Sequence, residues 1–476
     1  MSDSPSIHAL SRESQATGSP VPLYSDTGQR FTQELRLATQ AQRAGRLDEA
    51  IAAYVRLLAV QPSHAELHNN LGVALRLAGK LEASVVHHRL ALAADEDNPA
   101  LQSNLGNALR AVGRFDEAVR HHFKSITLSP SYAEGFFNLA LCLRDLGRLD
   151  EAIGCFGRSL ALHPTNRRVR VELALALLMR GDLAEGFAAY EDRKRLPETP
   201  APQFSQPPWD GGPVAGKRIL LHAEQGLSDV LLFVRFAPEL KARGAIVQVL
   251  CQAPLKELLA GLGYVDQTVA EGEALPAFDV HASIVSLPHL CRPDFHATAA
   301  EVPYLGAPAR RRIKLGRLER TRLRIGLYWS VSSTQAQDRQ RSMPFAQCLG
   351  LAGDPELLLF SLQGGAAQKD IQQFGAGGVV HDVGRGIFDF AEAASALAQL
   401  DLLIAVDAAI AHLAAAMGVR TWVLTPPVVD WRWRLGGERP WYPSVRLFRQ
   451  PRPGDWESVL AEVRAEIALL KEAATP

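Results

Sequence analysis

The sequence has little that would suit an extracellular, membrane-embedded or nucleic-acid-binding protein. Its five cysteines are odd in number, scattered and without a Cys-x-x-Cys motif, which disfavours a disulfide framework or structural zinc and fits a reducing cytoplasm. No run of about 18 apolar residues occurs, so no transmembrane helix is expected, and the N-terminus does not resemble a signal peptide. Lys plus Arg and Asp plus Glu each number 51. This zero net charge argues against a generic nucleic-acid or anionic-membrane binder.

The length and composition indicate several folded domains with unstructured segments around them. At about 150 residues per domain, 476 residues predict about three domains. Residues 1–30 are rich in Ser, Pro, Thr and Gln, which predicts a disordered N-terminal tail. Six prolines and a Gly-Gly pair fall between residues 197 and 213. They predict an extended linker over 198–215.

A strict internal period of 34 residues dominates the first half. Five glycines follow it, each with a small residue seven before it, another five after it and an aromatic or histidine ring nine after it. The glycines are Gly45, Gly79, Gly113, Gly147 and Gly181, and the rings are Tyr54, His88, His122, Phe156 and Tyr190. Glycine ends a helix at low steric cost, and small residues let two helices approach closely. The pattern predicts five helix–turn–helix repeats over 31–197 that stack into a solenoid with a concave binding face.

The same register explains two adjacent histidine pairs that look like metal ligands. His87–His88 and His121–His122 occupy one repeat position 34 residues apart. Neighbouring residues on a helix point about 100° apart. We therefore interpret both pairs as repeat packing and expect no metal site.

The pattern of residue types changes after Gly216, where short runs rich in β-branched residues alternate with stretches of helical periodicity. Seven segments read as strands: 217–223, 245–251, 278–285, 324–330, 356–363, 401–407 and 420–426. Helical patterns appear near 229–243, 389–400 and 409–417, and an amphipathic helix near 454–473. This alternation predicts parallel sheets covered on both faces. We expect two α/β domains, over 216–310 and over 320–476 with the terminal helix.

Two candidate sites lie where a strand meets a helix. Asp229 follows the first strand and a turn containing Gly226; a base would be useful there because ligands of open α/β sheets bind beyond the carboxyl ends of strands. Asp407 ends a buried strand, and His412 lies one turn inside the next helix, whose free N–H groups suit a phosphate. The plainer alternatives are a helix cap for Asp229 and a capped core helix with a satisfied histidine.

Further candidates are polar or aromatic residues near other strand ends. Arg341 follows the strand at 324–330, and its planar guanidinium suits a phosphate. Gln363 ends the next strand. A solvated basic loop is the alternative for Arg341. The rings around Trp431, Trp433 and Trp441 could stack on a base or sugar, but packing of an inter-domain seam is the interpretation that we favour.

Taken together, residues 216–455 resemble bacterial heptosyltransferase-like glycosyltransferases, which have a GT-B fold of two Rossmann-like domains. The segments carrying the resemblance are LLHAEQGLSDVLLF, RSMPF with FSLQGG, and VDAAIAHLAAAMGV followed by DWRW and PWYPSVRLFRQ. The repeats resemble the tetratricopeptide repeat. The resemblance implies an inverting, metal-independent transferase that needs no cofactor. It assigns Asp229 as the base and Asp407, His412, Arg341 and Gln363 to the nucleotide-sugar donor.

The sequence departs from that family at four positions. Ser228 and Val331 stand where Gly is usual, and Ala408 and Ala409 replace Thr and a small residue of the donor motif. A missing Gly hinders close approach of the backbone to phosphate, and a missing Thr removes a donor. Because of these changes, a degenerate and non-catalytic site remains an alternative interpretation.

The repeat region also resembles that of O-linked N-acetylglucosamine transferase. Asn70, Asn104 and Asn138 recur every 34 residues, at the position where that enzyme holds an extended polypeptide. A primary amide can donate to and accept from a peptide backbone; an ordinary polar helix position is the alternative.

The sequence thus predicts a cytoplasmic glycosyltransferase acting on a protein recruited by the solenoid. The resemblance suggests flagellin as the acceptor. The alternatives are a transferase acting on a glycan or lipid, and a non-catalytic scaffold.

Overall fold

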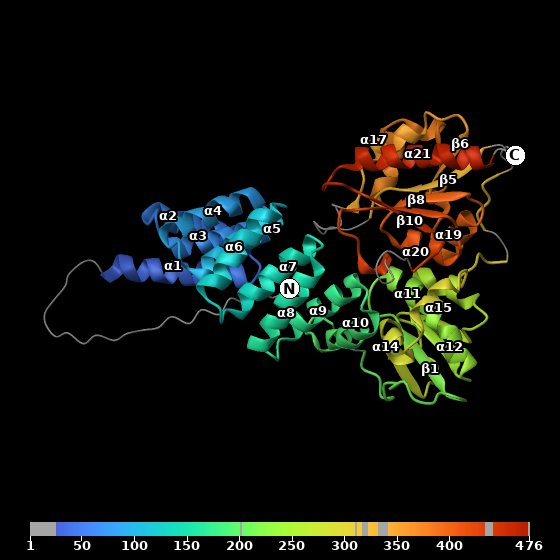
Figure 1. Cartoon of the computed structure of the whole chain (residues 1–476), viewed down its shortest axis with the longest axis horizontal. Coiled ribbons are helices and arrows are strands. Elements are labelled where there is room, and N and C mark those ends of the chain that lie inside the picture. The colour runs from blue at the N-terminus through green and yellow to red at the C-terminus, as the bar shows by residue number, and fades with distance from the viewer. Residues whose placement is uncertain are drawn as a thin grey trace. The chain divides into compact units, whose positions relative to one another are not determined.

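The computed structural model describes residues 25–199, 202–309, 312–316, 322–331, 341–433 and 441–474 (Figure 1). The chain divides into two compact units. The first contains residues up to Ala176 together with Asp192–Ala201, and the second contains Leu177–Glu191 together with Pro202–Pro476. The predicted fold class, a helical solenoid followed by an α/β module with parallel sheets, is confirmed.

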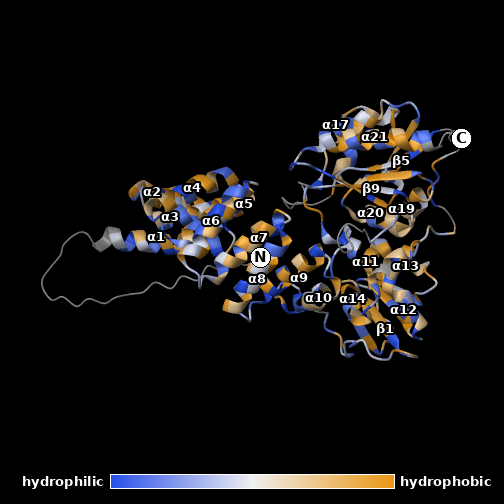
Figure 2. Cartoon of the chain, viewed as in Figure 1, coloured by the Kyte–Doolittle hydropathy of each residue, from blue (hydrophilic) through white to orange (hydrophobic). Residues whose placement is uncertain are grey.

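The N-terminal half consists of successive helix pairs. The helices are α1 (Ser25–Arg43), α2 (Leu47–Val60), α3 (Ala65–Leu77), α4 (Leu81–Ala94), α5 (Pro99–Ala111), α6 (Phe115–Leu128), α7 (Ala133–Asp145), α8 (Leu149–Leu162), α9 (Arg167–Arg180) and α10 (Leu183–Tyr190). All five periodic glycines have positive φ, between 75° and 103°, the left-handed conformation that glycine adopts without a Cβ clash. Helices of this half carry both hydrophobic and hydrophilic residues (Figure 2), as amphipathic helices packed on their neighbours do.

Two of the helix pairs use a glycine and a histidine where the others use alanine and a larger ring. A Cβ at Gly72 would lie 2.8 Å from the His88 ring, and one at Gly106 would lie 2.6 Å from the His122 ring. Both rings are buried, with exposed fractions of 1% and 0%. The histidines therefore pack directly on glycine backbone, which confirms that they belong to the repeat packing.

The first lobe of the α/β unit, residues 202–309, holds a four-stranded parallel sheet. Its strands are β1 (Arg218–His222), β2 (Ile246–Cys251), β3 (Gln267–Ala270) and β4 (Val280–Ser283), and its helices are α11 (Leu227–Phe233), α12 (Ala237–Ala242), α13 (Lys256–Ala260), α14 (Leu287–Cys291) and α15 (Phe295–Ala300). The spatial order is β3-β2-β1-β4. The order of the strands reverses between β1 and β4, which pair from Ile219 with Val280 to His222 with Ser283.

The second lobe, residues 312–474 where described, holds a six-stranded parallel sheet. Its strands are β5 (Leu323–Tyr328), β6 (Leu357–Ser361), β7 (Val380–Asp382), β8 (Leu402–Val406), β9 (Thr421–Thr425) and β10 (Val445–Arg449), and its helices are α17 (Phe345–Cys348), α18 (Asp370–Gln373), α19 (Phe390–Leu397), α20 (Ala409–Ala416) and α21 (Trp456–Ala474). The order is β10-β9-β8-β5-β6-β7. Numbered along this lobe it is the 3-2-1-4-5-6 order of a nucleotide-binding Rossmann sheet, with its reversal between β5 and β8.

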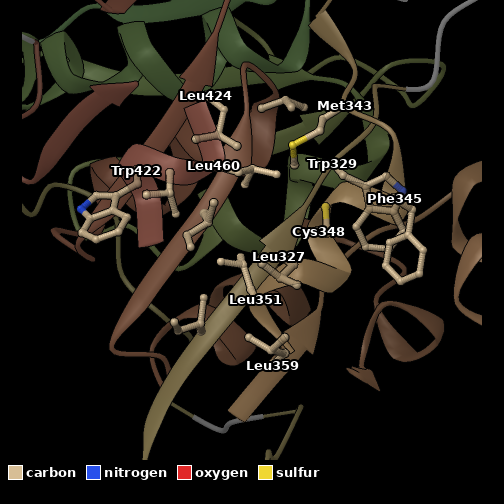
Figure 3. Close-up of a cluster of buried hydrophobic side chains, with 14 of the residues drawn as sticks. Leu327, Trp329, Met343, Phe345, Cys348, Leu351, Leu359, Trp422, Leu424 and Leu460 are labelled. Atoms are coloured by element: carbon tan, nitrogen blue, oxygen red, sulfur yellow. The ribbon is translucent and has the colours of Figure 1, made fainter. Parts of the chain in front are cut away.

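A large apolar core fixes the second sheet. Leu327, Leu359 and Leu424 of the strands pack with Leu460 of α21 and with Trp329, which follows β5 (Figure 3). β8 is buried along its whole length, as expected for a central parallel strand covered on both faces. The strands therefore hold the loops at their carboxyl ends on a rigid base.

Three predicted boundaries need correction. Helix α1 begins at Ser25, so residues 25–30 are helical rather than a disordered tail; residues 1–24 lie outside the described residues. The fifth predicted repeat is divided between the two units, because its residues Leu177–Glu191 belong to the α/β unit. The predicted linker is partly built into the first lobe, since Trp209 is 4% exposed and its N–H donates to His281 of β4 at 2.7 Å.

The sequence led us to expect no membrane-spanning helix and no disulfide framework. No helix in the described ranges is both long and apolar enough to cross a membrane. All five cysteines are free thiols.

Candidate functional site

The topology of the second lobe predicts a ligand site at the carboxyl ends of β5 and β8. Strand order reverses there, and ligands of open α/β sheets bind at such a point. Asp407 comes directly after β8, and Ser330 lies two residues beyond the end of β5. Asp407, which the sequence predicted as a donor-site residue, thus lies at the reversal point of the sheet.

Asp407 is held by two donors from different loops. Arg341 Nη1 donates to its Oδ2 at 3.1 Å, and the Trp433 indole N–H donates to its Oδ1 at 2.8 Å. Burial raises the pKa of Asp407, and the charge of Asp430 raises it further, while Arg341 and Trp433 oppose the shift. The side chain of Arg341 is 37% exposed and that of Asp407 is 11% exposed. Arg341 therefore presents the cationic, solvent-facing part of this cluster.

His412 lies beneath this cluster and is fully buried. Its ring stacks on Trp433 at a centroid distance of 3.9 Å, and its Nδ1 is 3.1 Å from the Tyr442 hydroxyl. Burial lowers the pKa of His412 to about 3, with a further contribution from the Arg432 charge. His412 is therefore a neutral, 0% exposed ring that packs on Trp433.

Gln363 shapes the loop after β5. Its Oε1 accepts from the backbone N–H groups of Trp329 and Ser330 at 3.0 and 2.9 Å, and its Nε2 donates to the Ser330 carbonyl at 2.9 Å. The side chain is 1% exposed. This amide orders the backbone at the reversal point, and its polar atoms are already engaged by that backbone.

Asp229 lies in the first lobe but is paired with the second. Arg432, in the 3₁₀ turn η9 (Trp431–Trp433), donates to Asp229 Oδ1 at 2.8 Å, and the Gly226 N–H donates to Oδ2 at 3.1 Å. The same guanidinium contacts Asp430 at 3.1 Å. Burial alone would raise the pKa of Asp430, but Arg432 lowers it below its ordinary value. The predicted base is thus a 4% exposed carboxylate in an ion pair between the lobes.

Sequence reasoning missed the residues that surround this ion pair. Gln225 accepts from Arg432 Nη2 at 3.2 Å, and its own amide donates to the Tyr190 hydroxyl of α10 at 2.9 Å. Phe187, also on α10, packs on Phe233 of α11 and on Trp431 at centroid distances of 5.9 and 5.6 Å. The ring position of the fifth repeat was visible in the sequence, but nothing in its period showed that it joins the α/β unit.

A second buried arginine also links the two lobes. Arg235 Nη1 donates to the Trp441 carbonyl, and Nη2 donates to the Tyr304 hydroxyl, both at 3.1 Å. Its guanidinium lies 4.5 Å from the Tyr304 ring centroid and 4.7 Å from that of Tyr442. These geometries fit cation–π contacts. The aromatic segment predicted to stack on a ligand or fill a seam thus contributes Trp441 and Tyr442 to the contact between lobes.

The four departures from the family pattern lie close to these residues. Ala408 is the N-cap of α20 and offers no side-chain cap. Ala409 is the first residue of that helix. The Val331 N–H donates to Ser342 Oγ at 3.1 Å, and Ser228 lies in the first turn of α11. The helix start beside Asp407 therefore lacks the hydroxyl that the family motif supplies.

The three predicted solenoid asparagines lie on successive helices α3, α5 and α7. Asn104 Nδ2 donates to Asn69 Oδ1 at 2.8 Å, and Asn138 Nδ2 donates to Ser103 Oγ at 3.0 Å. Asn138 is 7% exposed, whereas Asn70 and Asn104 are half-buried. The amides of Asn104 and Asn138 thus cross-link neighbouring repeats, and Asn70 and Asn104 retain the greater exposed surface.

Residues 35–99, 100–132 and 133–166 match models of the tetratricopeptide repeat. The chain therefore contains tetratricopeptide repeats, which occur widely as protein-interaction solenoids with a concave binding surface.

One relative and several solved structures are also similar to this chain. Protein FlbA of Caulobacter vibrioides is 29% identical over 318 residues, which cover 60% of this chain and 52% of FlbA. The chain thus spans about half the length of that relative. A MamA crystal structure is 21% identical, covering 35% of this chain and 92% of that one, with a TM-score of 0.31. Pseudomonas aeruginosa pilF is 22% identical, covering 38% and 80%, with a TM-score of 0.33.

Proposed function

We propose that this chain is an inverting glycosyltransferase that moves a sugar from a nucleotide-activated donor to a protein bound by its solenoid. The observation that carries the proposal is the Arg341–Asp407–Trp433 cluster at the reversal point of a Rossmann-ordered sheet. The two parallel sheets in one unit agree with a GT-B fold, in which a donor and an acceptor domain face each other across a crevice.

The chemistry of the cluster suits a nucleotide diphosphate. Arginine binds phosphate oxygens bidentately through its planar fork, and the Arg341 side chain is 37% exposed. Asp407 can accept from a ribose or sugar hydroxyl beside it. Gln363 and His412 act behind the surface, the first by ordering the β5 loop and the second by supporting Trp433.

Donor binding can be tested by titration calorimetry with uridine, guanosine, adenosine and cytidine nucleotide-sugars. We expect at least one to bind. Arg341→Ala should then weaken it roughly 10- to 100-fold, the loss of a charge-assisted hydrogen bond. Arg446→Ala is the matched control, because Arg446 lies on edge strand β10 in an ion pair with Glu466. Equal affinity in wild type and Arg341→Ala would remove Arg341 from the donor site.

Acceptor recognition is tested by co-expression with candidate proteins, flagellin first, followed by mass spectrometry of their glycans. We expect added sugar mass only when the full chain is present. The joint replacement of Asn70, Asn104 and Asn138 by Ala should lower acceptor affinity and leave donor affinity intact. Unchanged acceptor affinity in a folded triple variant would exclude these amides from recognition.

A non-catalytic tetratricopeptide scaffold is the second candidate. It is favoured by the buried ion pair of Asp229 with Arg432 and by the uncapped start of α20. This candidate predicts acceptor binding with no donor-dependent mass change for any nucleotide-sugar. A third reading, transfer to a glycan or lipid, predicts donor turnover without protein modification.

A further inference from the structure

Two carboxylates lie in the β1–α11 segment of the first lobe, and they differ sharply in their surroundings. Asp229 is 4% exposed, and each of its oxygens accepts a hydrogen bond, one from Arg432 and one from Gly226. Glu224 is half-buried and lies two residues beyond the end of β1. A general base must reach the proton that it removes, and exposure favours Glu224.

The topology puts Glu224 at the ligand-binding edge of its own sheet. Strand order in this lobe reverses between β1 and β4, and the crevice of such a sheet opens beyond those two carboxyl ends. Ser283 is the last residue of β4 and pairs in register with His222, the last residue of β1. Glu224 therefore lies at the reversal point, whereas Asp229 lies a full turn further along the chain, inside α11.

A strand end also orients the Glu224 carboxylate. The Ser283 hydroxyl donates to Glu224 Oε2, and Ser283 Oγ accepts from the Val285 N–H at 3.3 Å. The hydroxyl is thus fixed on both sides, and Ser283 itself is 2% exposed. A base held by a rigid element keeps the geometry that proton transfer requires.

Resting on the proposed function, we propose that Glu224, rather than Asp229, is the base that activates the acceptor hydroxyl. The Glu224 carboxylate takes the hydroxyl proton as the acceptor oxygen forms its bond to the anomeric carbon of the sugar. The bond from that carbon to the nucleotide oxygen breaks, and its electron pair leaves with the nucleoside diphosphate. Protonated Glu224 returns its proton to water. Asp229 caps α11 and holds Arg432, which joins the lobes.

The test compares Glu224→Gln, Glu224→Asp and Asp229→Asn in the full chain, with the nucleotide-sugar that calorimetry identifies. Glu224→Gln should lower kcat at least ~10²-fold with donor affinity unchanged, and should remove the fall of the rate at acid pH. Glu224→Asp should restore part of kcat together with the fall of the rate at acid pH, which we call the acid limb. Asp229→Asn should keep the acid limb whatever its kcat. Glu239→Gln, in α12, is the control with wild-type rates.

The outcomes separate the two proposals. If wild type transfers sugar and Glu224→Gln retains both kcat and the acid limb, Glu224 is not the base. If the acid limb disappears in Asp229→Asn instead, Asp229 is the base and our assignment is overturned. If wild type binds no nucleotide-sugar and transfers nothing from any of them, the proposed function fails, and the role of Glu224 fails with it.

Discussion

The solenoid should lose stability on mild acidification because it buries two neutral histidines. His88 and His122 have exposed fractions of 1% and 0%, and no ring nitrogen of either has a hydrogen-bond partner within the described part of the chain. Burial lowers the pKa of each to about 3, helped by the charges of Arg76 and Arg110 respectively. Protonation of either ring would leave an uncompensated charge inside a helix pair.

The size of the effect follows from proton linkage. An unfolded histidine has a pKa of about 6.5, so below that pH the unfolded chain binds protons that the folded rings do not. Stability is therefore complete above about pH 7 and falls as the pH drops from 6.5 toward 3. Between pH 7 and pH 5 the loss is about 2 kcal/mol for each histidine, or about 4 kcal/mol when both become exposed together.

Hydrogen exchange of the full chain, measured by mass spectrometry, can show which helices lose stability on acidification. After correction for intrinsic exchange rates, opening of α3–α6 should become up to ~10³-fold more favourable between pH 7 and pH 5. The half-buried neighbours His87 and His121, whose pKa values burial also lowers, contribute to the wild-type response.

A variant that lacks only the two buried histidines shows how much of the pH dependence of stability they cause. The glycine–histidine pairs are replaced by the larger alanine–ring pairs that stand at the same positions of neighbouring repeats, while His87 and His121 remain. The substitutions are Gly72→Ala with His88→Tyr, after Ala38 and Tyr54, and Gly106→Ala with His122→Phe, after Ala140 and Phe156. The pH response of α3–α6 should shrink by most of the expected amount. The same response in variant and wild type would refute the assignment to these rings.

Three further predictions concern stability. Phe187→Ala should cost the α/β unit about 3–5 kcal/mol in denaturant unfolding, since four rings pack on Phe187; a loss under 1 kcal/mol would contradict its core role. Arg432→Met should cost about 3–5 kcal/mol by leaving Asp229 buried and unpaired, and adding Asp229→Asn should recover part of it in a double-mutant cycle. Gly113→Ala, at φ +82°, should destabilise the solenoid by about 1–2 kcal/mol. Gly154→Ala, in open space on α8, should be neutral or stabilising in the same melting experiment.

The solenoid was predictable from sequence because its physics is local and repeated. Each glycine ends a first helix in the left-handed conformation, and in the second and third repeats the His88 and His122 rings pack on the glycine 16 positions earlier. Five copies in one register leave few alternative structures. The end of the solenoid was not predictable, because Phe187 follows the repeat pattern while its neighbours come from residues 233–441.

The strands that sequence reasoning found and missed differ in their place in the sheets. All seven predicted strands are present, whereas β3, β7 and β10 were missed; these three lie at sheet edges, and of the strands that were found only β4 does so. β10 alternates exposed and less exposed positions, and Val380–Asp382 of β7 carries two polar side chains. Edge strands are short and more polar because only one side is paired, so they lack the continuous apolar run that marks a buried parallel strand.

The candidate site resisted prediction because its decisive contacts join residues far apart in sequence. The motif identified Asp229 and Asp407 from a strand-to-helix pattern, which fixes position along a sheet but not exposure. Asp229 is closed off by Arg432, 203 residues away, and Asp407 is held by Arg341, 66 residues away. Burial decides which carboxylate can receive a proton from a substrate, and burial depends on these distant partners. The rule that ligands bind beyond the carboxyl ends of strands selected Asp229, but Glu224 satisfies it better. Glu224 is half-buried and lies at the reversal point of the sheet.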